Sequence, residues 1–282
     1  MGAVMAPLFL QAGHQLTVYN RDPKKATALI DQGAQLASSP QQACDSSDFI
    51  FTMLSDDKAI QSVFFDNKGL LSTDVSGKLF IDMSTLQVET VKILSDAVIK
   101  QGAEFIDAPV SGTVAPAAEG KLMFFCGGKS SVIEQATPLL EILSRRIIHA
   151  GDVGSGALLK LVVNLPLAVY WQSLAEAITL GSSGGLAEDL MLDAIADSSA
   201  ALAVLSMKIP TILGADLPVA FDMKSMEKDL NSILTTAQQL DLELPTTTST
   251  LRSYSEAIEK GNMSKKDAVA VVNYLNNKSK SK

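Results

Sequence analysis

Apolar and polar residues along the first half of the chain follow two alternating patterns. Short apolar runs of strand length are separated by stretches in which apolar residues recur with the 3.6-residue period of a helix. Strands are expected in "HQLTVYN", "DFIFTML", "KLFIDMS", "AEFIDAPV", "KLMFFCGG" and "RRIIHAG", and helices at 4–12, 23–32, 57–64, 88–101 and 131–143. This alternation predicts an α/β domain with a doubly wound, parallel sheet over residues 1–150.

The pattern changes after residue 150. Segment 157–185 is one long apolar stretch with helical character that ends in glycines. Further helices are expected at 187–197, 200–209, 223–240, 251–261 and 265–276. An all-helical second domain is therefore expected over residues 151–282. The last residues, "NNKSKSK", form a short basic tail that we expect to be disordered and solvated.

The chain begins with a helix-like segment that no strand precedes. "MGAVMA" matches the second half of the phosphate-binding pattern G-x-G-x-x-G, with Gly2 in the place of the third glycine. The strand and the first two glycines of such a loop, roughly ten residues at usual strand lengths, are absent. The loss of a central strand leaves backbone groups of its neighbours unpaired. We therefore expect a true start upstream of Met1, and the alternative is a natural truncation.

Polar residues at the end of the next predicted strand bear on the choice of cofactor. In a Rossmann-like unit, an acidic residue at this place binds the ribose 2′-hydroxyl of NAD, whereas a nearby arginine accommodates the 2′-phosphate of NADP. Asn20 and Arg21 occupy this place, and Asp22 lies beyond it. NADP(H) is therefore favoured, and NAD(H) stays possible. The alternative interpretation is a solvated charged loop.

The segment "DAPVSGT" ends a predicted strand in a turn of small residues. The exposed N–H groups of such a turn and its hydroxyl groups can hold a carboxylate. Ser111, Gly112 and Thr113 are therefore candidate substrate-binding residues. Considered alone, this pattern is more typical of an ordinary turn.

Two pairs of polar residues have helical spacing. Lys160 and Asn164 are four residues apart among leucines and valines, so they share one helix face. Burial lowers the pKa of a lysine and suits it to acid–base chemistry, whereas a lysine that extends to solvent is the alternative. Lys224 and Lys228 have the same spacing, which by itself is typical of a solvated helix face.

In this order and spacing, the segments resemble the β-hydroxyacid dehydrogenase family, which includes 3-hydroxyisobutyrate dehydrogenases and glyoxylate/succinic semialdehyde reductases. The resemblance covers nearly the whole chain. The matching motifs are "MGAVMA", "DMST" at 82–85, "DAPVSGT", "GSGALLKLVVN" at 154–164 and "KDL" at 228–230. Within the family, "TVAPAAEGKL" and "FDMKSMEKDL" look closest to the NADPH-using glyoxylate/succinic semialdehyde reductases.

The resemblance implies a Rossmann-like fold and a role for each matching residue. Lys160 is implied to be the catalytic lysine, which exchanges a proton with the carbonyl or alcohol oxygen, and Asn164 is implied to hold the substrate beside it. The carboxylate of the substrate is implied to bind at Ser111, Gly112 and Thr113. The implied cofactor-binding residues are Gly2, Asn20, Arg21, Leu54, Thr85 and Lys228.

Three further residues depart from the family pattern or from helix chemistry. Thr113 replaces the commoner glycine in the carboxylate turn, and Val163 replaces the first asparagine of a pair. Pro166 lies within the predicted catalytic helix, where it removes a hydrogen bond and crowds the preceding turn. We therefore expect a kink just past Asn164.

The resulting hypothesis is the NADPH-dependent reduction of a small aldehyde acid, of the glyoxylate or succinic semialdehyde type, to the hydroxy acid. One alternative is the oxidation of a β-hydroxyacid of the 3-hydroxyisobutyrate type. Another is a truncated, non-catalytic dimerisation module with impaired cofactor binding. An imine reductase or a phosphogluconate-type dehydrogenase is disfavoured, because the carboxylate turn occurs together with Lys160.

Composition limits the partners and the compartment. The net charge of −8 disfavours nucleic-acid binding. No segment is expected to cross a membrane, and the start lacks the features of a signal peptide, so a cytoplasmic or organelle-matrix location is expected. Cys44 and Cys126 are expected to be buried free thiols, and no metal site is expected. The resemblance implies a homodimer or homotetramer.

Overall fold

The computed structural model describes residues 1–280, which form parts of two compact units, Met1–Leu161 and Val162–Lys282. The boundary between the units lies within helix α8 (Ser155–Ser183), which contributes residues to both. The sequence-based division after residue 150 stays a prediction. Each unit is described by itself below.

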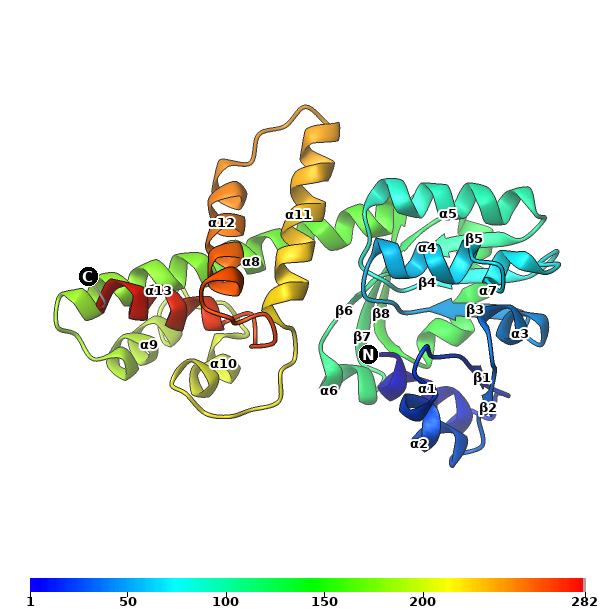
Figure 1. The fold of residues 1–282 in the computed structure, drawn as a ribbon, viewed down its shortest axis with the longest axis horizontal. Helices are drawn as coiled ribbons and strands as arrows, with labels where there is room; N and C mark the ends of the chain where they lie inside the picture. The colour runs from blue at the N-terminus through cyan, green and yellow to red at the C-terminus, as the bar shows by residue number, and fades with distance from the viewer. Residues whose placement is uncertain (281–282) are drawn as a thin grey trace. The chain divides into compact units, whose positions relative to one another are not determined.

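The first unit contains the strands and most of the short helices (Figure 1). Its strands are β1 (Thr17–Val18), β2 (Gln35–Leu36), β3 (Phe49–Thr52), β4 (Leu79–Asp82), β5 (Glu104–Asp107), β6 (Val110–Ser111), β7 (Leu122–Gly127) and β8 (Ser144–Gly151). Its α-helices are α1 (Gly2–Gln11), α2 (Thr27–Ile30), α3 (Pro40–Asp45), α4 (Asp57–Phe65), α5 (Val88–Lys100), α6 (Val114–Ala118) and α7 (Ser130–Glu141), with 3-10 turns η1 (Pro23–Ala26) and η2 (Leu70–Ser72).

The strands form two separate sheets. β1 and β2 pair in parallel as a two-stranded sheet, and the other six strands form a sheet with the order β3-β4-β5-β7-β6, in which β8 also pairs with β7. The fold is the predicted Rossmann-like one.

The expectation of an all-parallel sheet is wrong at β7, which runs antiparallel to β5 and β6. A parallel crossover needs a dozen or more residues, whereas β6 and β7 are joined only by a short connection containing the five-residue helix α6. The chain therefore returns antiparallel after the turn at Ser111. β3, β4 and β5 pair in parallel, as β7 and β8 do.

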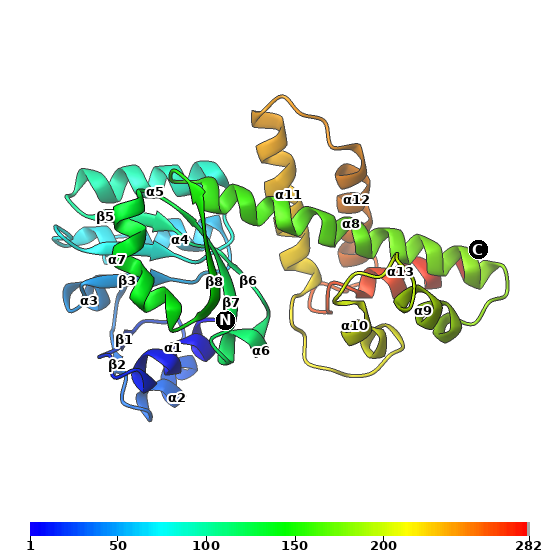
Figure 2. The ribbon, with the colours of Figure 1, turned by 180° about the vertical axis from the view of Figure 1, so that it is seen from behind.

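Helices cover both faces of the six-stranded sheet. Leu79 and Ile81 of β4 belong to a core with α1 and α7, whereas Phe80 belongs to a second core with α3, α4 and α5. α4 faces the viewer in Figure 1, and α7 faces the viewer in Figure 2, from the opposite side. This alternation along one strand is what a doubly wound sheet requires, since successive side chains point to opposite faces.

Local differences from the predicted elements have physical causes. The single helix expected at 23–32 is a 3-10 turn, η1, followed by the short helix α2, and Asp22 caps the turn by accepting the Lys24 N–H. β2 and α3 were not predicted, because a two-residue exposed strand and a six-residue helix carry too little periodicity. Cys44 and Cys126 are buried free thiols, as predicted, and burial raises their pKa to about 11 and about 12.

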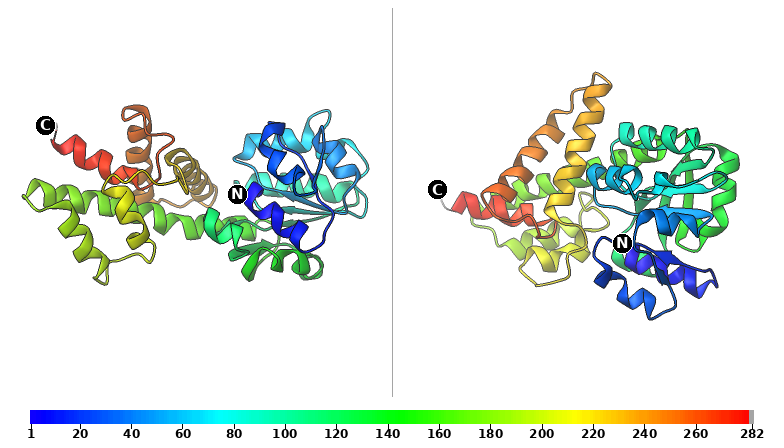
Figure 3. Two further views of the ribbon diagram at one scale, coloured as in Figure 1. Left: turned by 90° about the horizontal axis from the view of Figure 1, so that it is seen from below. Right: turned by 45° about the vertical axis from the view of Figure 1, so that its right-hand side comes forward.

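The second unit is helical, as predicted. Besides its part of α8, it contains α9 (Glu188–Ala196), α10 (Leu205–Ile212), α11 (Met223–Gln239), α12 (Pro245–Glu259) and α13 (Ala270–Lys280). α11 and α12 lie side by side, drawn in yellow and orange in Figures 1 and 3. The core contains the indole of Trp171 and the ring of Tyr254, whose hydroxyl donates to the Ala268 carbonyl at 2.9 Å.

The prediction of a disordered tail is wrong for residues 276–280, which continue α13. The ammonium group of Lys278 lies 2.6 Å from a carboxylate oxygen of Glu256, and Ser279 donates to the carbonyl of Asn276. These contacts hold the end of the helix, and residues 281–282 of the tail lie outside the described residues.

Two sequence-based expectations concern α8: that no segment would cross a membrane, and that the helix would kink just past Asn164. Its length and a mean hydropathy of 1.3 over 18 residues meet the usual criteria for a membrane span, contrary to the sequence-based expectation that no segment would. Those criteria are weak evidence, since a core helix meets them too, and α8 contributes Trp171 and its neighbours to a core. The helix also continues without interruption through Pro166, and the predicted kink stays a prediction.

Candidate active site

A pocket lies beyond the carboxyl end of β1. Its volume is about 510 Å³. It is lined by Tyr19, Asn20, Arg21, Pro23, Leu36, Ala37, Ser38 and Gln42. Among these described lining residues, Arg21 is the one cation and none is acidic. The side-chain oxygen of Asn20 accepts the N–H of Asp22 at 2.9 Å, and the predicted residues Asn20 and Arg21 both line this pocket.

The amino end of α1 lies beside the carboxyl end of β3. A β-carbon added to Gly2 would lie 4.0 Å from the β-carbon of Met53, the residue that follows β3. The free N–H groups at a helix amino end favour anions, and the carboxyl ends of parallel strands are the usual ligand-binding edge of such a sheet. Gly2 therefore lies at an edge of the sheet that suits an anion, and its role at the pyrophosphate stays a prediction.

A buried carboxylate joins the loops that follow β3 and β4. The hydroxyl groups of Thr52 and Ser84 each donate to Oδ1 of Asp82 at 2.7 Å, and the N–H of Leu54 donates to the Ser84 hydroxyl at 2.9 Å. Burial raises the pKa of Asp82 to about 7 against these hydrogen bonds. Leu54 and the residue after Ser84, Thr85, are the two predicted cofactor-path residues, and this network fixes their loops to each other.

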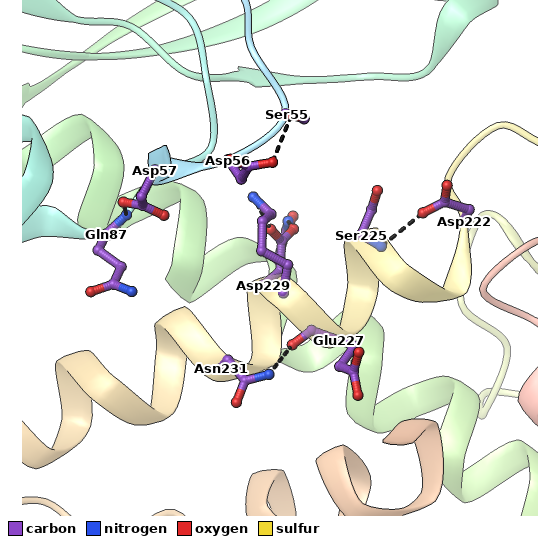
Figure 4. A network of polar contacts seen from close by, with 11 residues as sticks. Ser55, Asp56, Asp57, Gln87, Asp222, Ser225, Glu227, Asp229 and Asn231 are labelled. Carbon is purple, nitrogen blue, oxygen red and sulfur yellow. Dashed lines mark hydrogen bonds and ion pairs between the residues drawn. The ribbon is translucent and has the colours of Figure 1, made fainter. Parts of the chain in front are cut away.

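A second hydrogen bond joins the same loops a few residues further on. The Asp57 carboxylate, at the start of α4, accepts the N–H of Gln87 at 3.0 Å, just before α5 begins (Figure 4). Neither Asp57 nor Asp82 was predicted to have a role. Thr52, which contacts Asp82, and Gln87, which contacts Asp57, each lie 30 residues from the carboxylate in the chain, so local spacing gave no signal for either contact.

The predicted carboxylate turn follows directly on β6. Gly112 has φ +135°, a conformation that favours glycine, and a β-carbon there would lie 2.7 Å from Cδ2 of Leu122. Ser111 ends β6, and Thr113 immediately precedes α6. The turn therefore needs glycine at its centre for both conformation and space, while Ser111 and Thr113 flank it.

The start of α8, which carries Lys160, is anchored to the strand that leads to this turn. Oδ1 of the buried Asp107, at the end of β5, accepts the Gly154 N–H at 2.8 Å, and Oδ2 accepts the Ala157 N–H at 2.7 Å. Burial raises the pKa of Asp107, and the N–H groups oppose that shift. Lys160 is half-buried one turn further along the helix. Asp107 begins the motif "DAPVSGT" and was not predicted to have a role of its own.

In the helical unit, a buried aspartate lies between two of the predicted residues. The side-chain amide of Asn164 donates to Oδ2 of Asp229 at 2.7 Å, and the Lys228 ammonium lies 2.9 Å from Oδ1. Asp229 projects from α11, whose first turn is capped by Asp222 accepting the Ser225 N–H (Figure 4). Asp229 thus orients both Asn164 and Lys228. Asp229 is the central residue of the motif "KDL" and was not predicted to have a role of its own.

Comparison with known proteins identifies the family. The NAD binding domain of 6-phosphogluconate dehydrogenase matches residues 1–151, and the NAD-binding domain of NADP-dependent 3-hydroxyisobutyrate dehydrogenase matches residues 154–275. Glyoxylate/succinic semialdehyde reductase 2, chloroplastic, of Arabidopsis thaliana is 32% identical over 98% of this chain and 76% of its own length. The chain belongs to the β-hydroxyacid dehydrogenase family.

Two further relatives of this family agree. The 3-hydroxyisobutyrate dehydrogenase of Pseudomonas aeruginosa is 34% identical over 87% of this chain and 85% of its own length. The solved structure of Mycobacterium tuberculosis 3-hydroxyisobutyrate dehydrogenase with L-serine is 27% identical in sequence and superposes with a TM-score of 0.87. The match covers 98% of this chain and 95% of that chain. The protein is therefore an NAD(P)-dependent oxidoreductase of the hydroxyacid dehydrogenase type, and the fold predicted from the sequence is confirmed.

The residues of the first unit fit a nicotinamide dinucleotide. Arg21 and Asn20 would hold the adenosine end at the pocket after β1, Gly2 would lie by the pyrophosphate, and the loops of Leu54 and Thr85 would flank the path toward the nicotinamide. All of these positions are at the carboxyl ends of parallel strands or the amino end of a helix, where this class of cofactor binds.

Proposed function

We propose that the protein uses NADPH to reduce a small aldehyde acid, of the glyoxylate or succinic semialdehyde type, to the corresponding hydroxy acid. The observation that carries the choice of cofactor is the pocket after β1, which presents Arg21 and, among its described lining residues, no carboxylate. A carboxylate there would accept the 2′-hydroxyl of NAD, whereas a cation favours the 2′-phosphate. The nearby Asp22 is engaged with the Lys24 N–H instead.

The choice of substrate class rests on the turn after β6. The N–H groups and hydroxyls of Ser111, Gly112 and Thr113 would bind a carboxylate, which an aldehyde acid supplies. The similarity to the Arabidopsis thaliana glyoxylate/succinic semialdehyde reductase supports this class.

The chain's own residues would orient the substrate and handle its proton. When bound, the cofactor supplies the hydride. Lys160 would donate a proton to the carbonyl oxygen or stabilise its developing negative charge. Asn164, whose amide is oriented by Asp229, would hold the substrate beside it, and Lys228, paired with the same carboxylate, would border the nicotinamide end.

Oxidation of a β-hydroxyacid is the second candidate. The same groups serve both directions, because Lys160 would then accept the proton from the alcohol. The 34% identity to the Pseudomonas aeruginosa 3-hydroxyisobutyrate dehydrogenase favours this candidate. We also propose a homodimer or homotetramer in the cytoplasm or an organelle matrix, with neither nucleic acid nor membrane as a partner.

The proposal is tested by steady-state kinetics on the chain. Wild-type protein should oxidise NADPH with glyoxylate or succinic semialdehyde and prefer NADPH to NADH. Lys160→Ala should lower kcat by about 10²-fold or more, the range of general acid–base catalysis, while the Kd for NADPH changes little. Arg21→Ala should weaken NADPH binding and leave NADH binding nearly unchanged. Full turnover in Lys160→Ala contradicts the role of the lysine, and equal loss of both cofactors in Arg21→Ala contradicts the NADP assignment.

A further inference from the structure

The carboxylate of Asp107 has backbone partners on a distant segment. It ends β5, is fully buried, and accepts the N–H groups of Gly154 and Ala157, which lie 47 and 50 residues away. Both donors belong to the turn that opens α8. The first N–H groups of a helix have no partner within the helix, and a carboxylate at that end is also favoured by the helix dipole. Asp107 therefore acts as a cap supplied by another element.

Close packing leaves this carboxylate little freedom. A β-carbon added to Gly127 would lie 2.4 Å from Oδ1 of Asp107. At Gly156 it would lie 2.2 Å from the carbonyl oxygen of Phe125 and 2.8 Å from Oδ2 of Asp107. Contacts of this length are sterically forbidden, so both glycines are required for the strands and the helix start to approach the carboxylate. The enclosure fixes the position of the Asp107 side chain and of the two amides.

Two parts of the proposed substrate site meet at Asp107. Along the chain, β5 continues within four residues to Ser111 and the carboxylate turn. Through its hydrogen bonds, Asp107 also holds Ala157, and Lys160 follows three residues later on the same helix. The strand bearing the turn and the helix bearing the lysine are thus joined by one side chain, entirely within the first unit.

We propose that Asp107 is a positioning residue, which sets Lys160 relative to the Ser111–Thr113 turn by holding the amides of Gly154 and Ala157. The inference rests on the proposed function, since it concerns the distance between the group that handles the proton and the group that binds the carboxylate. A displacement of about 1 Å at such a site is enough to lower turnover by about 10²-fold without removing any reacting group.

The primary test is Asp107→Asn, which keeps the side-chain shape but replaces one acceptor oxygen with a donor facing an N–H. We expect kcat for the aldehyde acid to fall 10- to 100-fold, with KM and the Kd for NADPH within threefold of wild type. Asp267→Asn is the matched control, because Asp267 is also buried and accepts a backbone N–H, from Ala220, beside its ion pair with Lys208. It should lose stability but keep the kcat of its folded fraction.

A second variant reaches the same hydrogen bond from the other side. Gly154 has φ +91°, and a β-carbon there would lie 3.2 Å from Cγ1 of Val88, so Gly154→Ala should displace its amide from Asp107. We expect the same loss of kcat at nearly constant KM. If Asp107→Asn does not fold, the kcat of Gly154→Ala tests the proposal in its place. An unchanged kcat in the folded protein overturns the proposal.

Hydrogen exchange separates this inference from the proposed function. By NMR, the Gly154 and Ala157 amides should exchange at least tenfold faster in Asp107→Asn than in wild type, with most other amides unchanged. If wild type reduces no aldehyde acid, the proposed function fails, whereas the exchange rates still test the anchoring. If wild type is active, Lys160→Ala is inactive and Asp107→Asn retains full kcat, only the role of Asp107 is overturned.

Discussion

Two buried aspartates, one in each unit, differ in the kind of group that contacts their carboxylates. Asp107 in the first unit takes its hydrogen bonds from backbone N–H groups, whereas Asp229 in the second takes its contacts from the side chains of Asn164 and Lys228. Backbone donors cannot rotate away, so Asp107 fixes the path of the main chain. Side chains have rotamer freedom, so Asp229 selects among the conformations of functional groups. A buried carboxylate therefore positions the main chain in the first unit, and another positions side chains in the second.

The largest effect that tests this comparison is expected from Gly156→Ala. The added β-carbon meets the carbonyl oxygen of Phe125, a main-chain atom that cannot move without shifting β7. We expect the free energy of unfolding to fall by about 3 kcal/mol, the upper part of the range for overpacking, as measured by urea denaturation.

Gly184→Ala is the matched control. Its β-carbon would lie no closer than 3.4 Å to other atoms at the exposed end of α8, so the free energy of unfolding should change by about 0.5 kcal/mol or less. Equal stability of Gly156→Ala and wild type would mean that the chain around Asp107 yields easily. The contrast between a rigid scaffold and orientable side chains would then be lost.

A smaller effect is expected at Asp229. Asp229→Ala leaves Asn164 and Lys228 without their shared acceptor, and we expect the free energy of unfolding to fall by about 2 kcal/mol, less than for a fully buried ion pair because Lys228 is partly exposed. A double-mutant cycle between Asp229→Asn and Lys228→Met should give a coupling energy of about 1 kcal/mol. A coupling energy near zero would show that Asp229 does not hold the lysine, and would remove one side of the comparison.

The elements that could be predicted from the sequence are those whose apolar residues repeat over several positions. The apolar run at 79–81 within "KLFIDMS" predicts a strand, and the structure buries all four residues of β4. β2 is exposed at both of its residues, so hydrophobic periodicity could not reveal it. The antiparallel direction of β7 depends on the short connection between β6 and β7. The alternation of strands and helices does not take the length of that connection into account.

The site was predicted to a similar degree and for a related reason. Lys160, Asn164 and the Ser111–Thr113 turn were found because resemblance and local spacing mark them. The connecting roles of Asp82, Asp107 and Asp229 were missed, because each carboxylate joins its own segment to at least one partner 30 to 65 residues away in the chain. Those contacts exist only once the sheet and helices have formed.

The smallest expected effect concerns pH, and it contrasts carboxyl groups of the two units. Burial raises the pKa of Asp82 to about 7 and raises that of Asp107, so the folded state binds protons more tightly than the unfolded state. The contribution of Asp82 to stability is greatest below pH about 4 and is lost as pH rises toward 7, and that of Asp107 changes in the same direction. On the second unit, hydrogen bonds from Lys278 and Lys260 lower the pKa of Glu256 to about 2. Its contribution is present above pH about 4.5 and is lost as pH falls toward 2.

The two trends are separated by measuring urea denaturation from pH 3 to pH 8 in matched variants. Asp82→Asn should reduce the fall in the free energy of unfolding between pH 4 and pH 7. It should leave the change below pH 4 as it is in wild type. Glu256→Gln should reduce the fall in the free energy of unfolding below pH 4.5. It should leave the change between pH 4.5 and pH 7 as it is in wild type, because its ion pairs lie at the surface of the helical unit. If the free energy of unfolding of Asp82→Asn falls between pH 4 and pH 7 as steeply as that of wild type, Asp82 is ionised throughout that range. Its network with Thr52 and Ser84 would then stabilise the charge more strongly than burial opposes it.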